Sequence, residues 1–414
     1  MERIRRIREA AAARGFDAIV CSEPANVVYS TGYRSVLEQW GLSEPVAASV
    51  IPTDSQKPVM LVIPEALVAL DALSPTRAQE IRTFDLTNFC EVMRVKDPTQ
   101  PASSIGQEAM RIFGDKVRGR CEPDIIASIA SALKDHGLAA GNIAVDDLRV
   151  GAHISKVTPD IRVSDGLDAM IAARMIKTEP ELQAFRRVGK VADASLLAGA
   201  HALKPGVVWN DVQQSVVNTM TRMGAIPVDE GGLLFGGAFK GEFIPELFRT
   251  RHDCALEAGQ VVILEVLGKY DDLWFDLNRS ATIGKPSPEY QHLHDVIRDA
   301  YLMVIDRLRP GTWTAELGDV ALDYLRKHKV ATPERLVLFA HSVGHVPFEM
   351  PMPYPAYGRP RGKGFEVKEN MVLSVDCLYF GGNLGPCHME NVFIVHKDRA
   401  ETLYQVPLEL LGPR

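Results

Sequence analysis

The chain has 414 residues, of which 46% are hydrophobic and 24% are charged, and its 46 basic and 53 acidic residues give a formal net charge of −7. These values are ordinary for a folded globular protein and exclude a chain that is disordered, collagen-like or coiled-coil throughout. The net negative charge provides no global field that would hold nucleic acid or an anionic membrane surface. We therefore expect a small molecule or peptide as partner, and the length predicts two or three domains.

The sequence also bears on the cellular compartment. It has no apolar run near the roughly 18 residues that a membrane-spanning helix needs. Its first 16 residues place Glu2 and Glu9 among arginines, where a signal peptide would have an apolar core. We predict a cytoplasmic protein without membrane contact. Because the six cysteines are scattered without a Cys-x-x-Cys pair, we expect reduced, structural thiols.

In the first 165 residues, strand patterns alternate with helical patterns. Apolar strands are predicted at 18–21, 48–51, 59–62 and 143–145, with helical patterns near 64–73 and 125–136. This alternation favours an α/β domain with a mixed sheet. We place a domain boundary near residue 165, which gives domains 1–165 and 166–414.

Beyond residue 165, helices and strands occur in blocks. Long helices are predicted at 179–203, 209–223, 288–308 and 314–329, and the C-terminal third is rich in strands. Separate blocks of helices and antiparallel strands are typical of an α+β fold.

A first β-hairpin is predicted around Asp271 and Asp272, with one acidic residue in each strand. If the turn is centred between Tyr270 and Asp271, Glu265 and Asp276 face each other directly across the hairpin. Cross-strand partners project from one face with Cβ atoms about 5 Å apart. Apolar residues flank Glu265 on both sides, so its carboxylate is expected to face a cleft or the interior. The alternative is a hairpin that merely tolerates a charge at its solvent edge.

A second hairpin of the same construction is predicted near the C-terminus, where Asp376 and Glu390 are opposite each other about a centre at Asn383. One buried carboxylate pair can share a proton, but two pairs favour bound cations. Four carboxylates nearly balance two divalent ions. Together with one imidazole they suit a dinuclear site for manganese, iron, cobalt or zinc. The candidate imidazoles are His341 and His345, although an isolated histidine is more often structural.

The order acid, acid eleven residues later, histidine, acid, acid resembles the pita-bread metallopeptidase and creatinase superfamily, which includes methionine aminopeptidase, aminopeptidase P and prolidase. Residues 175–182, MIKTEPEL, resemble the entry into that family's catalytic domain. Residues 26–33, NVVYSTGY, are similar to the creatinase-type N-terminal domain. The resemblance implies a creatinase-type α/β domain followed by a pita-bread catalytic domain, and a homodimer.

Position by position, the resemblance also implies roles for these residues. It makes Glu265, Asp276, His345, Asp376 and Glu390 the ligands of two divalent metal ions. Asp376 would also be the general base that takes a proton from the attacking water, and His341 would handle a proton or stabilise an oxyanion.

The chain departs from the family pattern at several positions. Glu265 and Asp376 exchange the usual side-chain lengths, since the family has an aspartate at the position of Glu265 and a glutamate at the position of Asp376. A substrate-holding histidine expected 17 to 21 residues before the first acid is absent from 244–248, and Phe348 replaces another family histidine. These departures favour a specialised branch of the superfamily.

The leading hypothesis is therefore a metal-dependent hydrolase that cleaves a C–N bond of a small peptide or amino-acid derivative, similar to an Xaa-Pro dipeptidase or an amidohydrolase. Three alternatives stay open: a lyase of the dimethylsulfoniopropionate-cleaving type, a metal-free hydrolase similar to creatinase or ectoine hydrolase, and a catalytically silent binding protein.

Two further predictions concern residues near the acids in sequence. Arg279 is expected to orient a metal ligand. Five aromatic residues are candidates for a wall around an onium or proline-like substrate, with ordinary packing as the alternative: Trp274, Phe275, Phe348, Tyr354 and Tyr357.

Overall fold

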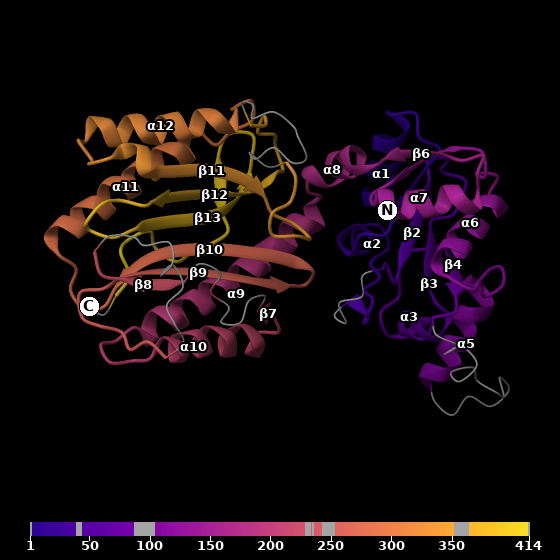
Figure 1. Ribbon diagram of the computed structural model, residues 1–414, viewed down its shortest axis with the longest axis horizontal. Coiled ribbons are helices and arrows are strands. Elements are labelled where there is room, and N and C mark those ends of the chain that lie inside the picture. Colours follow the sequence, from indigo (N-terminus) through magenta and orange to yellow (C-terminus); the bar gives the residue numbers. More distant parts are fainter. Residues whose placement is uncertain are drawn as a thin grey trace. The chain divides into compact units, whose positions relative to one another are not determined.

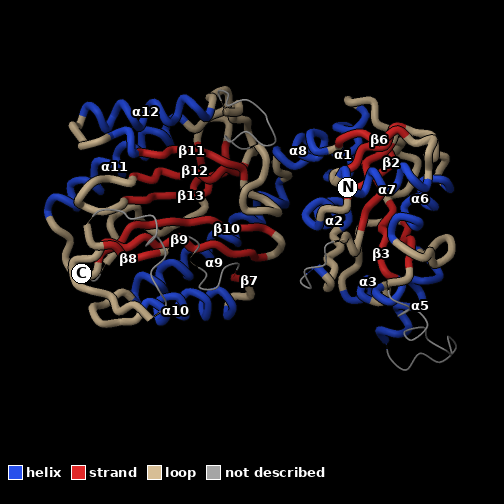
Figure 2. Tube along the Cα trace, in the orientation of Figure 1, coloured by secondary structure: helices blue, strands red, loops and turns tan. Residues whose placement is uncertain are grey.

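A computed structural model describes residues 2–38, 44–86, 104–227, 233, 236–241, 253–351 and 364–412. The chain forms two compact units, Met1–Arg174 and Met175–Arg414, and the mixture of helices and strands in each is shown in Figures 1 and 2. The sequence prediction placed the division near residue 165. Tyr354 and Tyr357 lie outside the described residues.

The first unit is built on a six-stranded mixed sheet in the order β4-β3-β2-β1-β5-β6. β1 pairs antiparallel with β2 and parallel with β5, as the predicted mixed sheet requires. The strands are β1 (Ala18–Cys21), β2 (Ala48–Pro52), β3 (Met60–Pro64), β4 (Glu80–Phe84), β5 (Asn142–Val145) and β6 (Arg162–Asp165).

Helices cover both faces of this sheet. Alternate residues of β1 point to opposite faces, so Ile19 packs with Ile7 of one helix layer while Val20 packs with Ile129 of the other. The segment predicted as one helix at 64–73 is instead a 3₁₀ turn followed by a single-turn helix. The helices are α1 (Glu2–Ala12), α2 (Pro24–Thr31), η2 (Glu65–Leu67), α3 (Leu70–Leu73), α5 (Ser104–Lys116), α6 (Ile125–Asp135), α7 (Leu148–Val157) and α8 (Leu167–Met175).

The second unit contains the four long helices expected from sequence: α9 (Glu179–Ala202), α10 (Trp209–Arg222), α11 (Pro288–Arg307) and α12 (Thr314–Lys327). The start of α9 is fixed by Glu181, whose carboxylate accepts hydrogen bonds from the Thr178 amide at 2.8 Å and hydroxyl at 2.6 Å. α11 begins after Ser287, whose hydroxyl accepts the amide of Tyr290 at 3.1 Å. Such caps satisfy backbone groups that the helix cannot pair itself.

An antiparallel sheet forms the centre of the second unit, with strand order β11-β12-β13-β10-β9-β7. Two short strands extend it, because β14 pairs with β13 and β8 pairs with β9. The strands are β7 (Ile226–Pro227), β8 (Gly237–Phe239), β9 (Val261–Tyr270), β10 (Leu273–Thr282), β11 (Leu336–Ser342), β12 (Val372–Tyr379), β13 (Cys387–Val395) and β14 (Ala400–Thr402).

One face of this sheet carries both helix pairs. Leu264 and Phe275 belong to the core that α9 and α10 share with β9 and β10, and Val375 and Cys377 belong to the core beneath α11 and α12. Figure 1 shows the two helix pairs along different parts of the sheet. Because these residues alternate with Glu265, Asp276 and Asp376 along their strands, those three acids project from the opposite face. Glu390 projects from that face too, since it pairs directly with Asp376.

The first hairpin has a register different from the predicted one. Asp271 and Asp272 both have positive φ angles, 51° and 65°, which is typical of a two-residue type I′ turn. This turn pairs Tyr270 with Leu273, so Glu265 lies opposite Asn278 and Asp276 lies opposite Leu267. The prediction that Glu265 and Asp276 face each other directly is therefore wrong. The shift of the partner is two residues, which leaves both acids on the same face.

The second hairpin has the predicted register, since Asp376 of β12 lies directly opposite Glu390 of β13. β13 also pairs with β10, which brings the two hairpins side by side in one sheet. Among the described helices, none combines the length and apolarity needed to cross a membrane.

Candidate metal centre

A row of four polar side chains runs across the sheet, one from each of four neighbouring strands. Asp376 lies opposite Glu390, Glu390 opposite Asn278, and Asn278 opposite Glu265. All four are buried, and Asp376 has the largest exposed fraction, 6%. Buried carboxylates are stable only with compensating charge or hydrogen bonds, so this row marks the chemical centre of the second unit.

The first of two clusters that could hold a metal ion consists of Asp276, His341 and Glu390, whose ligand atoms lie within 4.8 Å of one another. His341 comes from β11. Its Nδ1 lies 3.2 Å from the carbonyl oxygen of Ser342, and its Nε2 lies 3.4 Å from Asp376 Oδ2. With Nδ1–H donating to a carbonyl, Nε2 keeps its lone pair for a cation, which is the usual arrangement of a metal-binding histidine.

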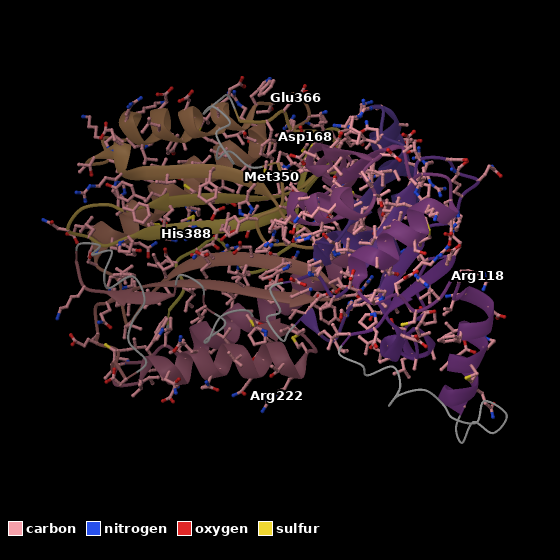
Figure 3. All side chains as sticks on the ribbon, turned by 45° about the vertical axis from the view of Figure 1, so that its right-hand side comes forward. Arg118, Asp168, Arg222, Met350, Glu366 and His388 are labelled. Carbon is pink, nitrogen blue, oxygen red and sulfur yellow. The ribbon has the colours of Figure 1, made fainter. Side chains whose placement is uncertain are left out.

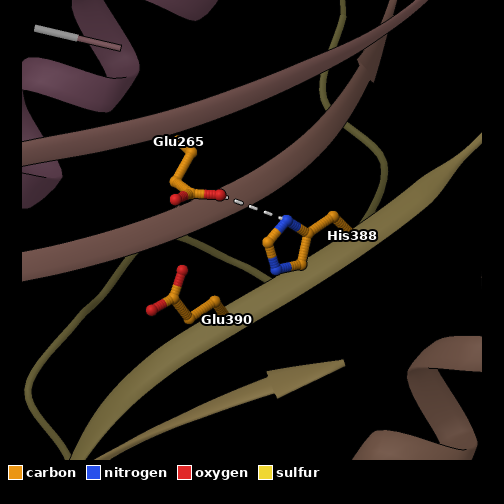
Figure 4. A group of neighbouring side chains, drawn as sticks. All are labelled: Glu265, His388 and Glu390. Carbon is orange, nitrogen blue, oxygen red and sulfur yellow. Dashed lines mark ion pairs between the residues drawn. The ribbon is translucent and has the colours of Figure 1, made fainter. Parts of the chain in front are cut away.

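The second cluster consists of Glu265, His388 and Glu390, again with ligand atoms within 4.8 Å. His388, labelled in Figure 3, precedes Glu390 by two residues on β13, so both side chains leave the same face (Figure 4). His388 Nδ1 lies 3.4 Å from Glu265 Oε2, and His388 Nε2 lies 3.4 Å from Asp376 Oδ1. Glu390 thus belongs to both clusters.

Neighbouring polar groups fix the carboxylates in place. Asn278 Nδ2 donates to Glu265 Oε2 at 2.9 Å, and the Ser374 hydroxyl donates to Glu390 Oε1 at 2.5 Å. Each bond occupies one oxygen of its carboxylate and holds the side chain in one orientation. The hydroxyl of Tyr404 donates to the carbonyl oxygen of Asp276 at 2.7 Å, which fixes the backbone at that ligand.

Arg279 holds the two hairpins together from beneath the site. Its Nη1 donates to the carbonyl oxygens of Asn278 and Glu390, both at 2.7 Å. Its other donors reach the Asn391 side chain and the carbonyls of 406–407, each at 2.8 Å. Burial lowers the pKa of the guanidinium to about 10. Arg279 therefore acts on the ligands through their backbone.

Crowding of the carboxylates changes their proton affinity. Burial, assisted by the charge of Asp376, raises the pKa of Asp276 to about 7. Burial and the charges of Asp276 and Asp376 also raise the pKa of Glu390 well above its usual range. Burial by itself would raise the pKa of Asp376, but its contacts with His341 and His388 outweigh burial and lower it. The site thus disfavours several uncompensated negative charges, which is the condition that a bound cation relieves.

Unpaired polar atoms also indicate that these residues fit a metal. In the described part of the chain, several buried side-chain atoms without a hydrogen-bond partner gather at this centre: Asp276 Oδ1, His341 Nε2, Asp376 Oδ2, His388 Nδ1 and Nε2, and Glu390 Oε2. Buried polar groups are normally satisfied. Carboxylate oxygens and imidazole nitrogens together suit manganese, iron, cobalt or zinc, so the donor set fits the predicted divalent ions without specifying their number.

The structure brings most of the predicted site residues together. Glu265, Asp276, His341, Asp376 and Glu390 share one face of the sheet. His345 lies in the segment after β11, where its carbonyl oxygen accepts Trp274 Nε1 at 3.1 Å, and neither of the two clusters contains it. Its role as a ligand stays a prediction.

Sequence reasoning missed His388. The signal for it was present, because His388 and Glu390 are two residues apart on a predicted strand and must share a face. Phe348, one of the predicted wall aromatics, stacks on His341 with ring centroids 4.5 Å apart, whereas Phe275 packs in the core on the opposite face.

Residues 243–397 match the model of metallopeptidase family M24. An Xaa-Pro dipeptidase from Pyrococcus furiosus is 21% identical over 248 residues, which cover 59% of this chain and 67% of that protein. An Xaa-Pro dipeptidase from Pyrococcus horikoshii is 20% identical over 271 residues, covering 64% and 71%.

Solved structures show the same fold over the whole chain. The prolidase from Pyrococcus horikoshii OT3 has a TM-score of 0.69 at 16% identity, covering 99% of this chain and all of that one. The X-Pro aminopeptidase from Thermotoga maritima has a TM-score of 0.71 at 17% identity, covering 99% of each chain. The predicted fold class, an α/β N-terminal domain followed by a pita-bread domain, is confirmed. The chain thus has the fold of these solved prolidase and aminopeptidase structures, and residues 243–397 carry its similarity to metallopeptidase family M24.

Proposed function

We propose that this protein is a metal-dependent hydrolase that cleaves a C–N bond of a small peptide or amino-acid derivative, with Xaa-Pro dipeptides as the first substrate class to test. The observation that carries the proposal is the convergence of two buried carboxylate–imidazole clusters on one shared residue, Glu390. The match to an M24 metallopeptidase model and the similarity to two Xaa-Pro dipeptidases support it.

The proposed ligands are Glu265, Asp276, Asp376 and Glu390 with an imidazole. Two divalent ions, when bound, supply positive charge that acidifies water and polarises a carbonyl group. Asp376 takes the proton of the attacking water at a carboxylate oxygen. His341 Nε2 lies 3.4 Å from Asp376 Oδ2, which places an imidazole beside the proposed general base. Glu390 belongs to both clusters and holds them at a fixed separation.

Two histidines compete for the imidazole position beside Asp276. The resemblance to the family assigns it to His345 and gives His341 a proton-handling role. The geometry favours His341, because its Nε2 faces the cluster while Nδ1 is held by the carbonyl oxygen of Ser342. We adopt His341 for this cluster, and metal titration of the two single variants decides between them.

The proposal is tested with purified full-length protein, by measuring its metal content and its hydrolysis of a panel of Xaa-Pro dipeptides. Asp276→Asn removes one ligand charge and is expected to abolish turnover and lower metal affinity about 100-fold or more. Asp271→Asn is the matched control, because Asp271 lies in the turn of the same hairpin with a side chain that is 52% exposed. Its left-handed backbone is compatible with asparagine.

Several outcomes would contradict the proposal. Turnover that survives complete removal of metal would indicate chemistry like that of creatinase. An alkene product would indicate a lyase. A protein that binds no divalent ion and turns over none of these substrates would be a binding protein that retained the fold.

We also propose that the protein is cytoplasmic, as its N-terminal sequence predicts, and that it is a homodimer, as the resemblance to the family implies. Light scattering coupled to size-exclusion chromatography measures the mass directly. A mass of about 45.5 kDa, that of one chain, would contradict the dimer.

A further inference from the structure

His388 belongs to one of the two clusters but is not among the ligands named above, and it lies between two carboxylates of the centre. Its exposed fraction is 1%. One ring nitrogen, Nδ1, faces Glu265 and the other, Nε2, faces Asp376, each at 3.4 Å from a carboxylate oxygen. Figure 4 shows the ring between the strand that carries Glu265 and its own strand, with Glu390 beside it. A buried imidazole placed between two carboxylates requires a physical explanation.

The first step concerns charge. A neutral imidazole has one N–H and one lone pair. If one nitrogen donates its N–H to a carboxylate, the lone pair of the other nitrogen faces a second carboxylate oxygen. Two electron-rich atoms directed at each other in a buried site repel unless a cation lies between them. That cation is either a second proton on the ring or a metal ion.

The second step concerns distance. An N–H···O hydrogen bond has its most common length near 2.9–3.0 Å, so both contacts of His388 are long. Two donors that each lie about 2.1 Å from one ion at a tetrahedral angle are about 3.4 Å apart. The His388 Nδ1 to Glu265 Oε2 distance of 3.4 Å equals that separation. Glu390 supplies a third ligand atom within 4.8 Å of the other two.

The third step concerns the second oxygen of Glu390. Ser374 occupies Glu390 Oε1, and Glu390 Oε2 has no hydrogen-bond partner. Asn278 in turn binds Glu265 Oε2, which keeps this carboxylate directed across the sheet toward His388. A Glu–His–Glu set is thereby held by a hydroxyl and an amide that are themselves fully buried.

We propose that His388 is a metal ligand, which binds an ion through Nδ1 together with Glu265 and Glu390 while its Nε2 faces Asp376. This inference rests on the proposed metal-dependent function and deepens it by naming the ligands of one ion. One ring then faces both the ion and the general base. A nitrogen ligand among carboxylates shifts metal preference from magnesium and manganese toward cobalt and zinc.

The experiment uses the full-length chain, freed of metal by a chelator and titrated with Zn²⁺ and with Co²⁺. Calorimetry gives stoichiometry and affinity, and the visible absorption of bound Co²⁺ reports its ligands. His388→Gln is expected to bind one ion instead of two, or to bind one of the two ions with about 100-fold lower affinity. The absorption spectrum of bound Co²⁺ should also change. The control is His294→Gln, which removes another buried imidazole, on α11, whose exposed fraction is 1%.

A second variant keeps the test decisive if removal of the ring disturbs folding. His388→Asp restores an oxygen ligand, and we expect it to bind Mn²⁺ more tightly relative to Zn²⁺ than the unaltered protein does. The inference is overturned if His388→Gln, folded by circular dichroism, binds both ions with unchanged affinity, because the ring would then be a protonated bridge between carboxylates. That result would not contradict the proposed function. If the unaltered protein binds no metal ion, both the inference about His388 and the proposed function are contradicted.

Discussion

Lys177 Nζ lies 2.6 Å from Glu349 Oε2, and both side chains are almost completely buried. Lys177 immediately precedes the cap of α9, and its Nζ also donates to the Ser342 hydroxyl at 3.2 Å. The Glu349 amide donates to the Ser342 carbonyl oxygen at 2.8 Å. That carbonyl also lies against His341 Nδ1. The ion pair therefore connects the start of α9 to the backbone that orients His341.

Removal of one member of this ion pair is expected to be more damaging than removal of both. Lys177→Met leaves the buried Glu349 charge uncompensated, and we expect the free energy of unfolding to fall by about 3–5 kcal/mol. The double variant Lys177→Met, Glu349→Gln should recover a large part of that loss. Urea unfolding of the metal-free proteins measures both. A single variant as stable as the unaltered protein would show that the pair contributes nothing.

Gly268 lies directly opposite Phe275 in the first hairpin, and a Cβ at this position would meet the Phe275 ring. Gly268→Ala overpacks the core beneath α9 and should lower the free energy of unfolding by about 1–3 kcal/mol.

The control for this change is Gly318→Ala on α12, where an added Cβ meets only an ordinary contact with the Leu338 carbonyl oxygen. Alanine is preferred to glycine inside a helix by about 0.5–1 kcal/mol, so this variant should be more stable. Thermal or urea unfolding compares the two. Equal stabilities would show that the hairpin accommodates the methyl group by moving the ring.

Glu401 of β14, which belongs to neither metal-binding cluster, provides a pH-dependent contribution to the free energy of unfolding. Its carboxylate accepts hydrogen bonds from Arg186 at 2.7 and 2.8 Å, and one of its oxygens lies 2.6 Å from His396 Nε2. The hydrogen bonds from Arg186 lower the pKa of Glu401 to about 2 from 4.5. A pKa that is lowered by folding stabilises the folded state above pH 4.5, and this stabilisation is lost as the pH falls toward 2.

Glu401→Gln is accordingly expected to cost about 1 kcal/mol at pH 7. The stability difference between variant and unaltered protein should shrink as the pH falls below 4.5. Urea midpoints at pH 7, 5, 4 and 3.5 measure this, with Glu369→Gln, at an exposed position, as control. A difference that stays constant over this range would assign the effect to packing instead of charge.

His341 and His345 can be separated by metal binding. We expect His341→Ala to lower the affinity for one metal ion about 100-fold, because it removes the imidazole of the Asp276 cluster. His345→Ala should leave metal affinity within a few-fold of the unaltered value. Calorimetric titration of metal-free protein decides the matter, and the opposite ranking would return the ligand role to His345, as the resemblance to the family implies.

Sequence was a good guide wherever a local pattern determines the structure. The four long helices of the second unit begin at the predicted residues because apolar periodicity and caps such as Ser287 define them locally. The Asp376–Glu390 pairing also followed from symmetry about Asn383. The register at Glu265 did not follow, because it depends on whether Asp271 and Asp272 both adopt left-handed backbone angles, which ordinary turn residues leave open.

The sequence did not reveal which histidine lies beside the acidic residues. A motif that contains both His341 and His345 does not reveal which ring turns toward Asp276, since that depends on the end of β11 and on the carbonyl of Ser342. His388 was accessible in principle, because strand alternation places it beside Glu390. It was missed because the family pattern gave no reason to look for an imidazole there.

The row from Asp376 through Glu390 and Asn278 to Glu265 also has a kinetic consequence. Its members come from two hairpins about 100 residues apart in sequence, and β10 must dock on β13 before the row exists. Such long-range pairing is slow compared with formation of a single hairpin. Capture of a divalent ion during refolding should therefore lag behind secondary structure, and its rate would report when β10 docks on β13.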